Sequence, residues 1–97
     1  MFARIGTWQG TPDELERWVA RAREHVKPNI QQDRGLKAAY WLVDRASGKA
    51  LIVTLWADEA AMQASERTRA QRQAGTTAAT GAQVMTDRYE VVDSLIM

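Results

Sequence analysis

The pattern of apolar and polar residues along the chain predicts four strands. Residues 1–9 have a β-favouring composition with a single charge. Residues 36–43 and 50–56 are two apolar, β-rich runs, and the polar loop between them contains Gly48, which predicts a hairpin with a positive φ at that glycine. Residues 84–92 alternate polar and apolar side chains, which indicates a last strand at the end of the chain.

The first helix has the sharpest local signal in the sequence. Thr11 stands directly before Pro12 and three residues before Glu14, which predicts a capping box with proline in the first turn. An apolar stripe with a 3.6-residue period follows and is expected to end near Pro28. The stripe consists of Leu15, Trp18, Val19, Ala22 and Val26. This pattern predicts an amphipathic helix.

A second helix follows the predicted hairpin. Asp58 and Glu59 open it, and residues with high helix propensity continue to Ala74. Gly75 supplies a stop signal, and the small, polar residues 76–81 indicate a loop before the last strand. Whether that loop acts as a lid is left open by the sequence.

The order βαββαβ in 97 residues predicts one α+β domain over residues 1–97, folded as a ferredoxin-like sandwich. In that fold a four-stranded antiparallel sheet carries both helices on one face. We expect the first and third strands to lie side by side and parallel, joined by a right-handed crossover. Trp8 and Trp56, each at the end of its strand, are then expected at the same rim of the sheet.

Both faces of the two middle strands are apolar, because side chains alternate across a strand. One set comprises Ala39, Trp41, Val43, Ala50, Ile52, Thr54 and Trp56, and the other comprises Ala38, Tyr40, Leu42, Leu51, Val53 and Leu55. Two short helices cover one face only, so the other exposes more hydrophobic surface than a soluble monomer normally tolerates. We therefore expect an obligate homodimer that packs sheet on sheet, forming an α+β barrel.

Composition and charge exclude several classes of function. Thirteen Lys and Arg against twelve Asp and Glu leave a formal charge of +1, which argues against binding to nucleic acid or to an anionic membrane. The chain has no cysteine and one histidine, so neither a thiolate nucleophile nor a metal site is expected. We expect no cofactor. The N-terminus lacks a charged segment followed by an apolar one, and a cytoplasmic location is the default expectation.

Several runs in the chain resemble the dimeric α+β barrel superfamily and, within it, the small antibiotic-biosynthesis monooxygenase-like proteins. The runs are Gly35 to Arg45, Ser47-Gly48-Lys49, Thr54-Leu55-Trp56, Glu59 to Glu66 and Arg88-Tyr89-Glu90-Val91-Val92. The resemblance implies a cofactor-independent monooxygenase that holds an activated aromatic compound in an apolar cleft between sheet and helices while dioxygen reacts with its anion. Because this superfamily hosts several activities, a non-catalytic homodimer that binds a small apolar ligand or serves as a scaffold is the alternative.

Haem degradation is disfavoured within this resemblance. The haem-degrading relatives carry an Asn on the first strand and a Trp and a His on the second helix. Here the first strand has no Asn, and the predicted second helix has neither Trp nor His.

The candidate ligand-binding residues are aromatic or line the second helix. Trp8 and Trp56 offer a rim on which a flat organic ligand could stack. Ala61 belongs to the small-residue face of the second helix, which either lines a cavity or packs closely on the sheet, and Met62 and Ser65 belong to a neighbouring face. For both tryptophans, burial in the core or in a dimer interface is the alternative interpretation.

Three residues are candidates for catalysis. His25 could serve as a base, Tyr40 could donate a hydrogen bond to an oxyanion, and Arg88 could hold an enolate. Because adjacent residues of a strand face opposite sides, at most one of Arg88 and Tyr89 points into a given cavity. The alternatives are a partly solvated histidine, an interface tyrosine and a solvent-exposed arginine.

Overall fold

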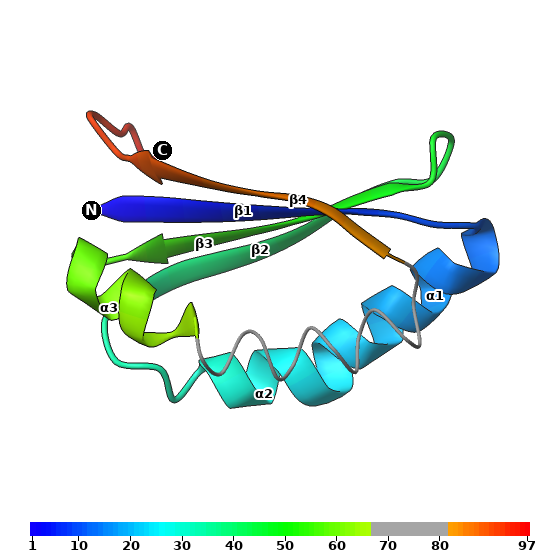
Figure 1. Ribbon diagram of the computed structural model, residues 1–97, viewed down its shortest axis with the longest axis horizontal. Helices are drawn as coiled ribbons and strands as arrows, with labels where there is room; N and C mark the ends of the chain where they lie inside the picture. The colour runs from blue at the N-terminus through cyan, green and yellow to red at the C-terminus, as the bar shows by residue number, and fades with distance from the viewer. Residues whose placement is uncertain (67–81) are drawn as a thin grey trace.

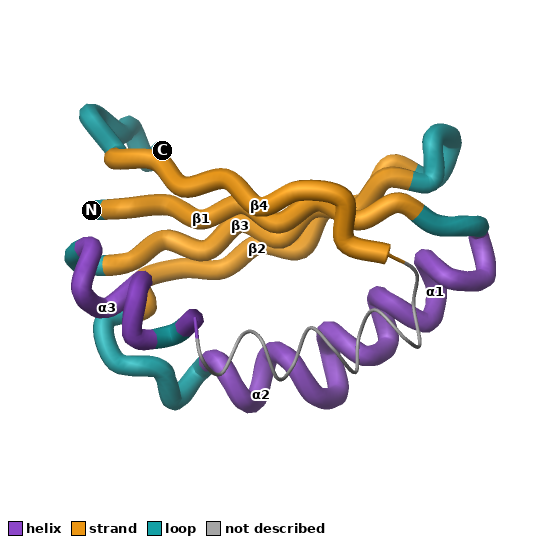
Figure 2. Tube along the Cα trace, in the orientation of Figure 1, coloured by secondary structure: helices purple, strands orange, loops and turns teal. Residues whose placement is uncertain are grey.

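The computed structural model describes residues 1–66 and 82–97 and has the predicted α+β architecture, with the helices on one side of a four-stranded sheet (Figure 1). Figure 2 shows the same arrangement as a strand layer and a helical layer. The elements are β1 (Phe2–Gln9), α1 (Pro12–Arg21), the π-helical turn η1 (Ala22–Val26), α2 (Lys27–Ile30), β2 (Leu36–Asp44), β3 (Lys49–Trp56), α3 (Glu59–Ala64) and β4 (Ala82–Glu90).

The strand order is β2-β3-β1-β4, and each neighbouring pair is antiparallel. The expectation that the first and third strands are parallel is therefore wrong. The hairpin reverses the chain after β2, so that β3 enters the sheet beside β1 in the opposite direction. In this register Trp8 pairs with Ala50 and Trp56 pairs with Phe2, which places the two tryptophans at opposite ends of the strands rather than at one rim.

The two alternating sets of the hairpin lie on opposite faces as predicted. Ala39, Trp41 and Val43 pair with Thr54, Ile52 and Ala50 in the register of β2 and β3. On the helical side, Trp41, Val43 and Ile52 pack against a buried cluster that contains Trp8, Leu15, Trp18 and Ala50. The core therefore lies between the sheet and α1.

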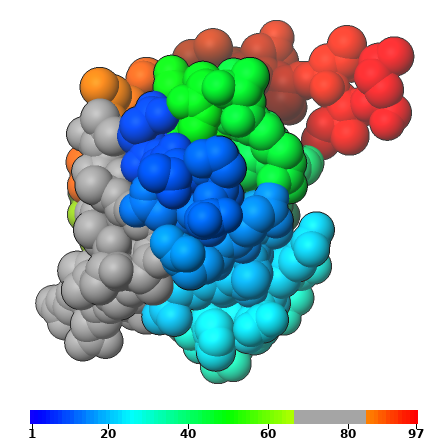
Figure 3. All heavy atoms as spheres, turned by 90° about the vertical axis from the view of Figure 1, so that its right-hand side faces the viewer, coloured from blue at the N-terminus to red at the C-terminus, as the bar shows by residue number. Residues whose placement is uncertain are grey.

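The opposite face of the sheet, called the open face below, is apolar and partly exposed. The large hydrophobic residues Tyr40 and Leu42 on β2 and Met85 and Tyr89 on β4 are 46–57% exposed. Beyond β4, Val92, Leu95, Ile96 and Met97 are at least 85% exposed, and the C-terminal residues project from the body of the molecule in Figure 3. In the described residues no helix is long and apolar enough to span a membrane.

Gly48 has the positive φ predicted for it, at +77°. A Cβ atom at this position would lie 2.3 Å from the carbonyl oxygen of Gly10, which is too close for any other residue. Asp44 stabilises the same loop, because its carboxylate accepts hydrogen bonds from the backbone N–H groups of Ala46 and Ser47. Hydrogen bonds from Ser47 hold the pKa of Asp44 below its usual value.

The first helix begins as predicted but extends further. The Glu14 N–H donates to Thr11 Oγ1 over 3.2 Å, and the Thr11 N–H donates to Glu14 Oε1 over 2.8 Å, which confirms the capping box. Helical structure continues past Pro28 to Ile30. Proline has no N–H to bond the preceding turn, and here it falls in the first turn of α2, directly after the wider π turn η1, where that donor is not needed.

Replacing Thr11 by alanine is expected to lower the free energy of unfolding by about 1 kcal/mol, because the first turn of α1 loses a side-chain cap. Urea denaturation at neutral pH measures this change.

The backbone N–H of Thr11 also holds the pKa of Glu14 below its ordinary value of 4.5, and this carboxylate therefore stabilises the fold above that value. Its contribution is lost as the pH falls through the lowered pKa.

The role of Glu14 is tested with Glu14→Gln, and Glu24→Gln is the matched control; Glu14 is partly exposed and Glu24 is exposed on the same helical stretch. Between about pH 5 and pH 3, Glu14→Gln should weaken the acid dependence of stability, whereas Glu24→Gln should leave it closer to that of the unsubstituted chain. An unchanged acid dependence in Glu14→Gln would contradict the role of the capping box.

The second helix begins as predicted, with Asp58 as the N-cap that accepts the Ala61 N–H over 2.8 Å. The structure describes α3 from Glu59 to Ala64, and the predicted continuation to Ala74, the stop at Gly75 and the loop 76–81 lie outside the described residues. The last strand runs from Ala82 to Glu90, two residues earlier than predicted, because Glu90 pairs with Phe2 at the start of β1.

Candidate functional site

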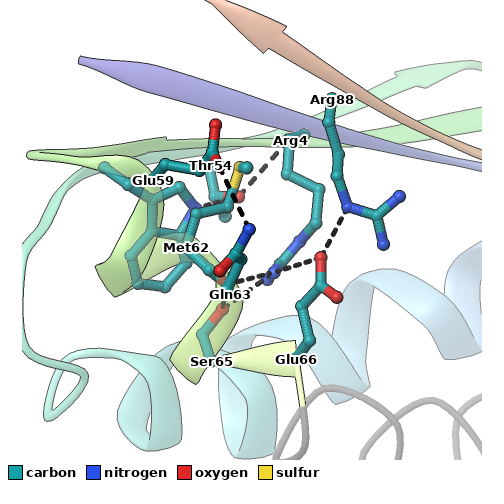
Figure 4. A network of polar contacts seen from close by, with 9 residues as sticks. Arg4, Thr54, Glu59, Met62, Gln63, Ser65, Glu66 and Arg88 are labelled. Atoms are coloured by element: carbon teal, nitrogen blue, oxygen red, sulfur yellow. Dashed lines mark hydrogen bonds and ion pairs between the residues drawn. The ribbon is translucent and has the colours of Figure 1, made fainter.

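A polar cluster lies on the helical side of the sheet where β1 faces α3 (Figure 4). Its centre is Arg4 of β1, whose side chain is 6% exposed. Arg4 Nη1 donates to Ser65 Oγ over 2.8 Å and to the Met62 carbonyl oxygen over 3.2 Å. A buried cation requires such partners, because burial removes its hydration. Arg4 thus ties the central strand to the end of α3.

Trp56 forms the apolar wall of this cluster. The guanidinium carbon of Arg4 lies 5.3 Å from the centre of the Trp56 ring, a cation–π contact. The Trp56 Nε1–H donates to Thr54 Oγ1 over 3.0 Å, and the Thr54 hydroxyl donates to the Arg4 carbonyl oxygen over 3.3 Å. Trp56 is 1% exposed, so its ring is packed within the fold and has its polar atom satisfied.

Glu66 joins Arg4 to a second arginine on the neighbouring strand. Arg88 Nε donates to Glu66 Oε1 over 2.6 Å, and Arg4 Nη1 lies 3.9 Å from the same oxygen. This hydrogen bond raises the pKa of Arg88 above its ordinary value, so the guanidinium is charged throughout the accessible range of pH. The three side chains carry two positive charges and one negative charge.

Local sequence explains why these groups meet. Arg4 and Arg88 are paired directly across β1 and β4 and therefore project from the same face. The chain approaches α3 closely at Gly35, which has a φ of +81° and where a Cβ would lie 2.6 Å from that of Ala61. The Ala57 N–H donates to the Gly35 carbonyl oxygen over 2.8 Å. Gly35 therefore allows α3 to pack closely against the loop before β2.

The structure brings together part of the predicted ligand-binding set. Trp56, Met62 and Ser65 surround Arg4, and both residues from α3 and its C-cap are buried. Ala61 lies close to Gly35, which favours close packing over a cavity at this point of the helix. Trp8 is at the other end of the strands, where its ring centre lies 5.7 Å from that of Trp18.

The three candidate catalytic residues are not brought together. Arg88 faces the helical layer and is 46% exposed. Tyr40 is 57% exposed on the open face, the opposite side of the sheet. His25 belongs to η1, and its side chain is 59% exposed and 3.9 Å from Glu24. A single cleft therefore does not contain both Tyr40 and Arg88 of one chain.

Sequence reasoning missed Arg4 and Glu66. Arg4 is the single charged residue of residues 1–9. It is four residues before Trp8, so the two side chains project from the same face of the strand, and this spacing is the signal that Arg4 faces the core. Glu66 carries no such signal, because an acidic residue on a helix is normally solvated. In the described residues no three His, Cys, Asp or Glu side chains form a group that could hold a metal ion.

Comparisons with known proteins agree on one family. A family model described as antibiotic biosynthesis monooxygenase matches residues 1–76. A protein of Deinococcus radiodurans named after this family has a similar structure, with a TM-score of 0.79 at 16% identity, covering 100% of this chain and 98% of that one. No curated protein sequence matches the chain.

Two further solved structures illustrate the range of this fold. The ActVA-Orf6 monooxygenase of Streptomyces coelicolor, solved in complex with nanaomycin D, has a TM-score of 0.78 at 15% identity and covers 99% of this chain and 90% of that one. A protein of unknown function from Nitrosomonas europaea has a TM-score of 0.74 at 18% identity, covering 99% and 93%. At these identities the likeness shows the fold alone.

Proposed function

The chain belongs to the antibiotic biosynthesis monooxygenase family, and from this premise we propose that it is a cofactor-independent monooxygenase of a small aromatic, polyketide-type compound. The family match over residues 1–76 carries the proposal. It is supported by the similar structure of the Streptomyces coelicolor monooxygenase, which was solved with nanaomycin D. The ligand is proposed to bind between the sheet and the helices, and residues 1–97 to act as one domain.

The proposed reaction uses the substrate itself as the reductant. An ionised phenol or enol donates electrons to dioxygen, one oxygen atom enters the ring as a carbonyl, and the other leaves as water with the two hydrogens of the oxidised carbon. The protein has to bind the anion and keep water away. Arg88 is the residue that we propose for holding the anion, because its guanidinium is charged and lies on the helical side of the sheet.

A non-catalytic homodimer remains the second candidate function. Two observations favour it. Trp56 is 1% exposed, so its ring offers no open face on which a ligand could stack. Tyr40 and Arg88 project from opposite faces of the sheet, so one chain does not supply both to a single reaction centre.

We propose that the partner of the open face is a second copy of this chain. Support comes from the four large hydrophobic side chains that are 46–57% exposed there, on the two outer strands β2 and β4. The half-buried residues Leu51, Val53 and Leu55 of β3 continue the same apolar surface between them. A two-fold axis that packs this face on its copy removes both surfaces from water at once.

Oxygen consumption tests the enzyme proposal. The purified chain is incubated in air with a panel of hydroxylated anthrones and naphthols, and oxygen uptake is followed together with tryptophan fluorescence. We expect uptake above the buffer rate with at least one compound. We expect Arg88→Gln to reduce it by about tenfold or more, because a charge-assisted contact to the anion is lost.

His25→Gln and Tyr40→Phe are the matched controls, since both side chains are more than half exposed and neither joins the cluster of Arg4. We expect both variants to retain the activity of the unsubstituted chain. If the chain consumes no oxygen above the buffer rate but the aromatic compounds still quench its tryptophan fluorescence, the chain is a non-catalytic binding module instead. A loss of oxygen uptake in Tyr40→Phe would indicate that Tyr40 takes part in catalysis.

A further inference from the structure

The helical side of the sheet has a polar end and an aromatic end. Arg4 and Trp8 are four residues apart on β1, so both side chains project from this side, about 13 Å apart along the strand. Figure 1 shows α3 beside the start of β1 and α1 beside its end. The cluster around Arg4 occupies the polar end. At the aromatic end, the ring centres of Trp8 and Trp18 are 5.7 Å apart, and Trp41 packs on the same buried cluster.

The indole N–H of Trp8 is a buried donor without an acceptor. Trp8 is 8% exposed, and among the described residues nothing accepts a hydrogen bond from its Nε1. Trp56 shows the ordinary case, because its Nε1–H donates to Thr54 Oγ1 over 3.0 Å. A buried N–H that has lost its water and gained no acceptor destabilises the fold. The donor of Trp8 is therefore available to an acceptor on a bound molecule.

The contacts of the Trp8 ring give this donor a fixed direction. A Cβ atom at Gly6 would lie 2.8 Å from Trp8 Cζ3 and 3.0 Å from Trp8 Cη2, so the benzene edge of the indole lies over a residue that has no side chain. Nε1 is on the other side of the indole from Cζ3, and the N–H is thus on the edge turned away from Gly6. Trp18 packs against the ring at an interplanar angle of 51°. A donor held in this way needs no reorganisation when it binds an oxygen atom.

The surroundings of this donor select the kind of acceptor. The buried cluster and the residues packed on it are apolar: Trp8, Leu15, Trp18, Ala50, Val19, Trp41, Val43 and Ile52. A carboxylate or phenolate in such surroundings would lose its hydration and gain no counter-charge. A neutral carbonyl oxygen accepts the N–H at a much smaller cost in desolvation, and the ring that carries it gains apolar and aromatic contacts. The place therefore fits a ring carbonyl better than an anion.

We propose that the Trp8 Nε1–H donates a hydrogen bond to a neutral ring carbonyl of the aromatic ligand of this protein. The inference rests on the proposed function for an aromatic ligand between the sheet and the helices, and it adds that this ligand is an aryl ketone or a quinone. The carbonyl is a different group from the anionic oxygen proposed for Arg88, which pairs with Arg4 at the polar end. Trp8 thus selects and orients the ligand and does not touch the reacting atoms.

The test compares 9-fluorenone with fluorene, which has the same three rings and no carbonyl. Both compounds are titrated under nitrogen into the ¹⁵N-labelled full chain, and the indole N–H resonances are assigned by triple-resonance experiments. We expect the Trp8 resonance to move downfield with fluorenone, as a new hydrogen bond requires, beyond the ring-current shift that fluorene also causes. Equal shifts with the two compounds, or no binding of fluorenone, would overturn the proposal.

Trp8→Phe keeps an aromatic ring and removes the donor. We expect the ratio of the fluorene and fluorenone dissociation constants to fall by about three- to tenfold in this variant, the contribution of one neutral hydrogen bond. Trp18→Phe is the matched control, because it removes an indole from the same buried cluster. It should keep the ratio of the unsubstituted chain. An equal fall in both variants would reduce the effect to packing and overturn the proposal.

Far-ultraviolet circular dichroism and the urea midpoint check that both variants are folded. If Trp8→Phe does not fold, the resonance shifts of the unsubstituted chain decide the question without it. Oxygen uptake with the phenolic panel in the absence of a fluorenone-specific shift would leave the proposed function standing while this site fails. A fluorenone-specific shift in a chain that consumes no oxygen would do the opposite.

Discussion

At micromolar concentration, the unsubstituted chain is expected to be a dimer and the variant Leu42→Asp mainly a monomer. Leu42 is 46% exposed on the open face, among the other large hydrophobic side chains of that face. A two-fold interface would bury this position in both copies, so the substitution places two unpaired carboxylates in an apolar contact. We expect the dissociation constant of the dimer to rise by at least about a hundredfold, measured by sedimentation equilibrium.

Gln32→Asp provides the matched control, because it adds the same charge at an exposed position after α2, in the helical layer. It should leave the dimer intact. Two results would contradict the proposed interface: an unsubstituted chain that sediments as a monomer, or a Leu42→Asp variant that dimerises as tightly as Gln32→Asp. Circular dichroism shows whether the monomeric variant is still folded.

Removing the Trp18 side chain is expected to cost the largest amount of stability. Trp18 is 3% exposed in the core cluster, with its ring centre 5.7 Å from that of Trp8. Trp18→Ala deletes the ring and leaves a cavity between α1 and the sheet, at a cost of about 3–5 kcal/mol in the free energy of unfolding. For a domain of this size that is about a third or more of the roughly 5–10 kcal/mol available.

The measurement is urea denaturation followed by circular dichroism, since the substitution removes a fluorophore. Leu95→Ala serves as control, because Leu95 is 85% exposed beyond β4. It should change the free energy of unfolding by less than about 0.5 kcal/mol in the monomeric background Leu42→Asp. A loss below about 1 kcal/mol in Trp18→Ala would mean that the core does not depend on the contact between α1 and the sheet.

Part of the candidate site followed from sequence. Residue type and predicted position indicate Trp56, Met62, Ser65 and Arg88 as candidates, and in the structure they lie in or beside the cluster around Arg4. The sequence did not predict the cluster itself, because the residue at its centre is an arginine of the first strand. A charge in a strand is normally assigned to solvent, and its burial here depends on partners 58 and 61 residues away in the sequence.

The error in the predicted positions of the two tryptophans has a different cause. The expectation of Trp8 and Trp56 at one rim depends on a parallel arrangement of the first and third strands. The sequence does not reveal on which face of the sheet each tryptophan lies; in the structure both are on the helical side. Alternation contains no information on strand direction, however, and the antiparallel register separates the two rings by the length of the paired strands.

The amino-acid sequence by itself determined the elements, their order, the capping box at Thr11 and the positive φ of Gly48, because each depends on neighbours within a few residues. It also determined that both sides of the hairpin are apolar. The tertiary structure alone decided that β3 runs antiparallel to β1 and that Arg4, Glu66 and Arg88 form one cluster. These features arise from packing and charge between segments far apart in the chain, and local patterns do not encode such distances.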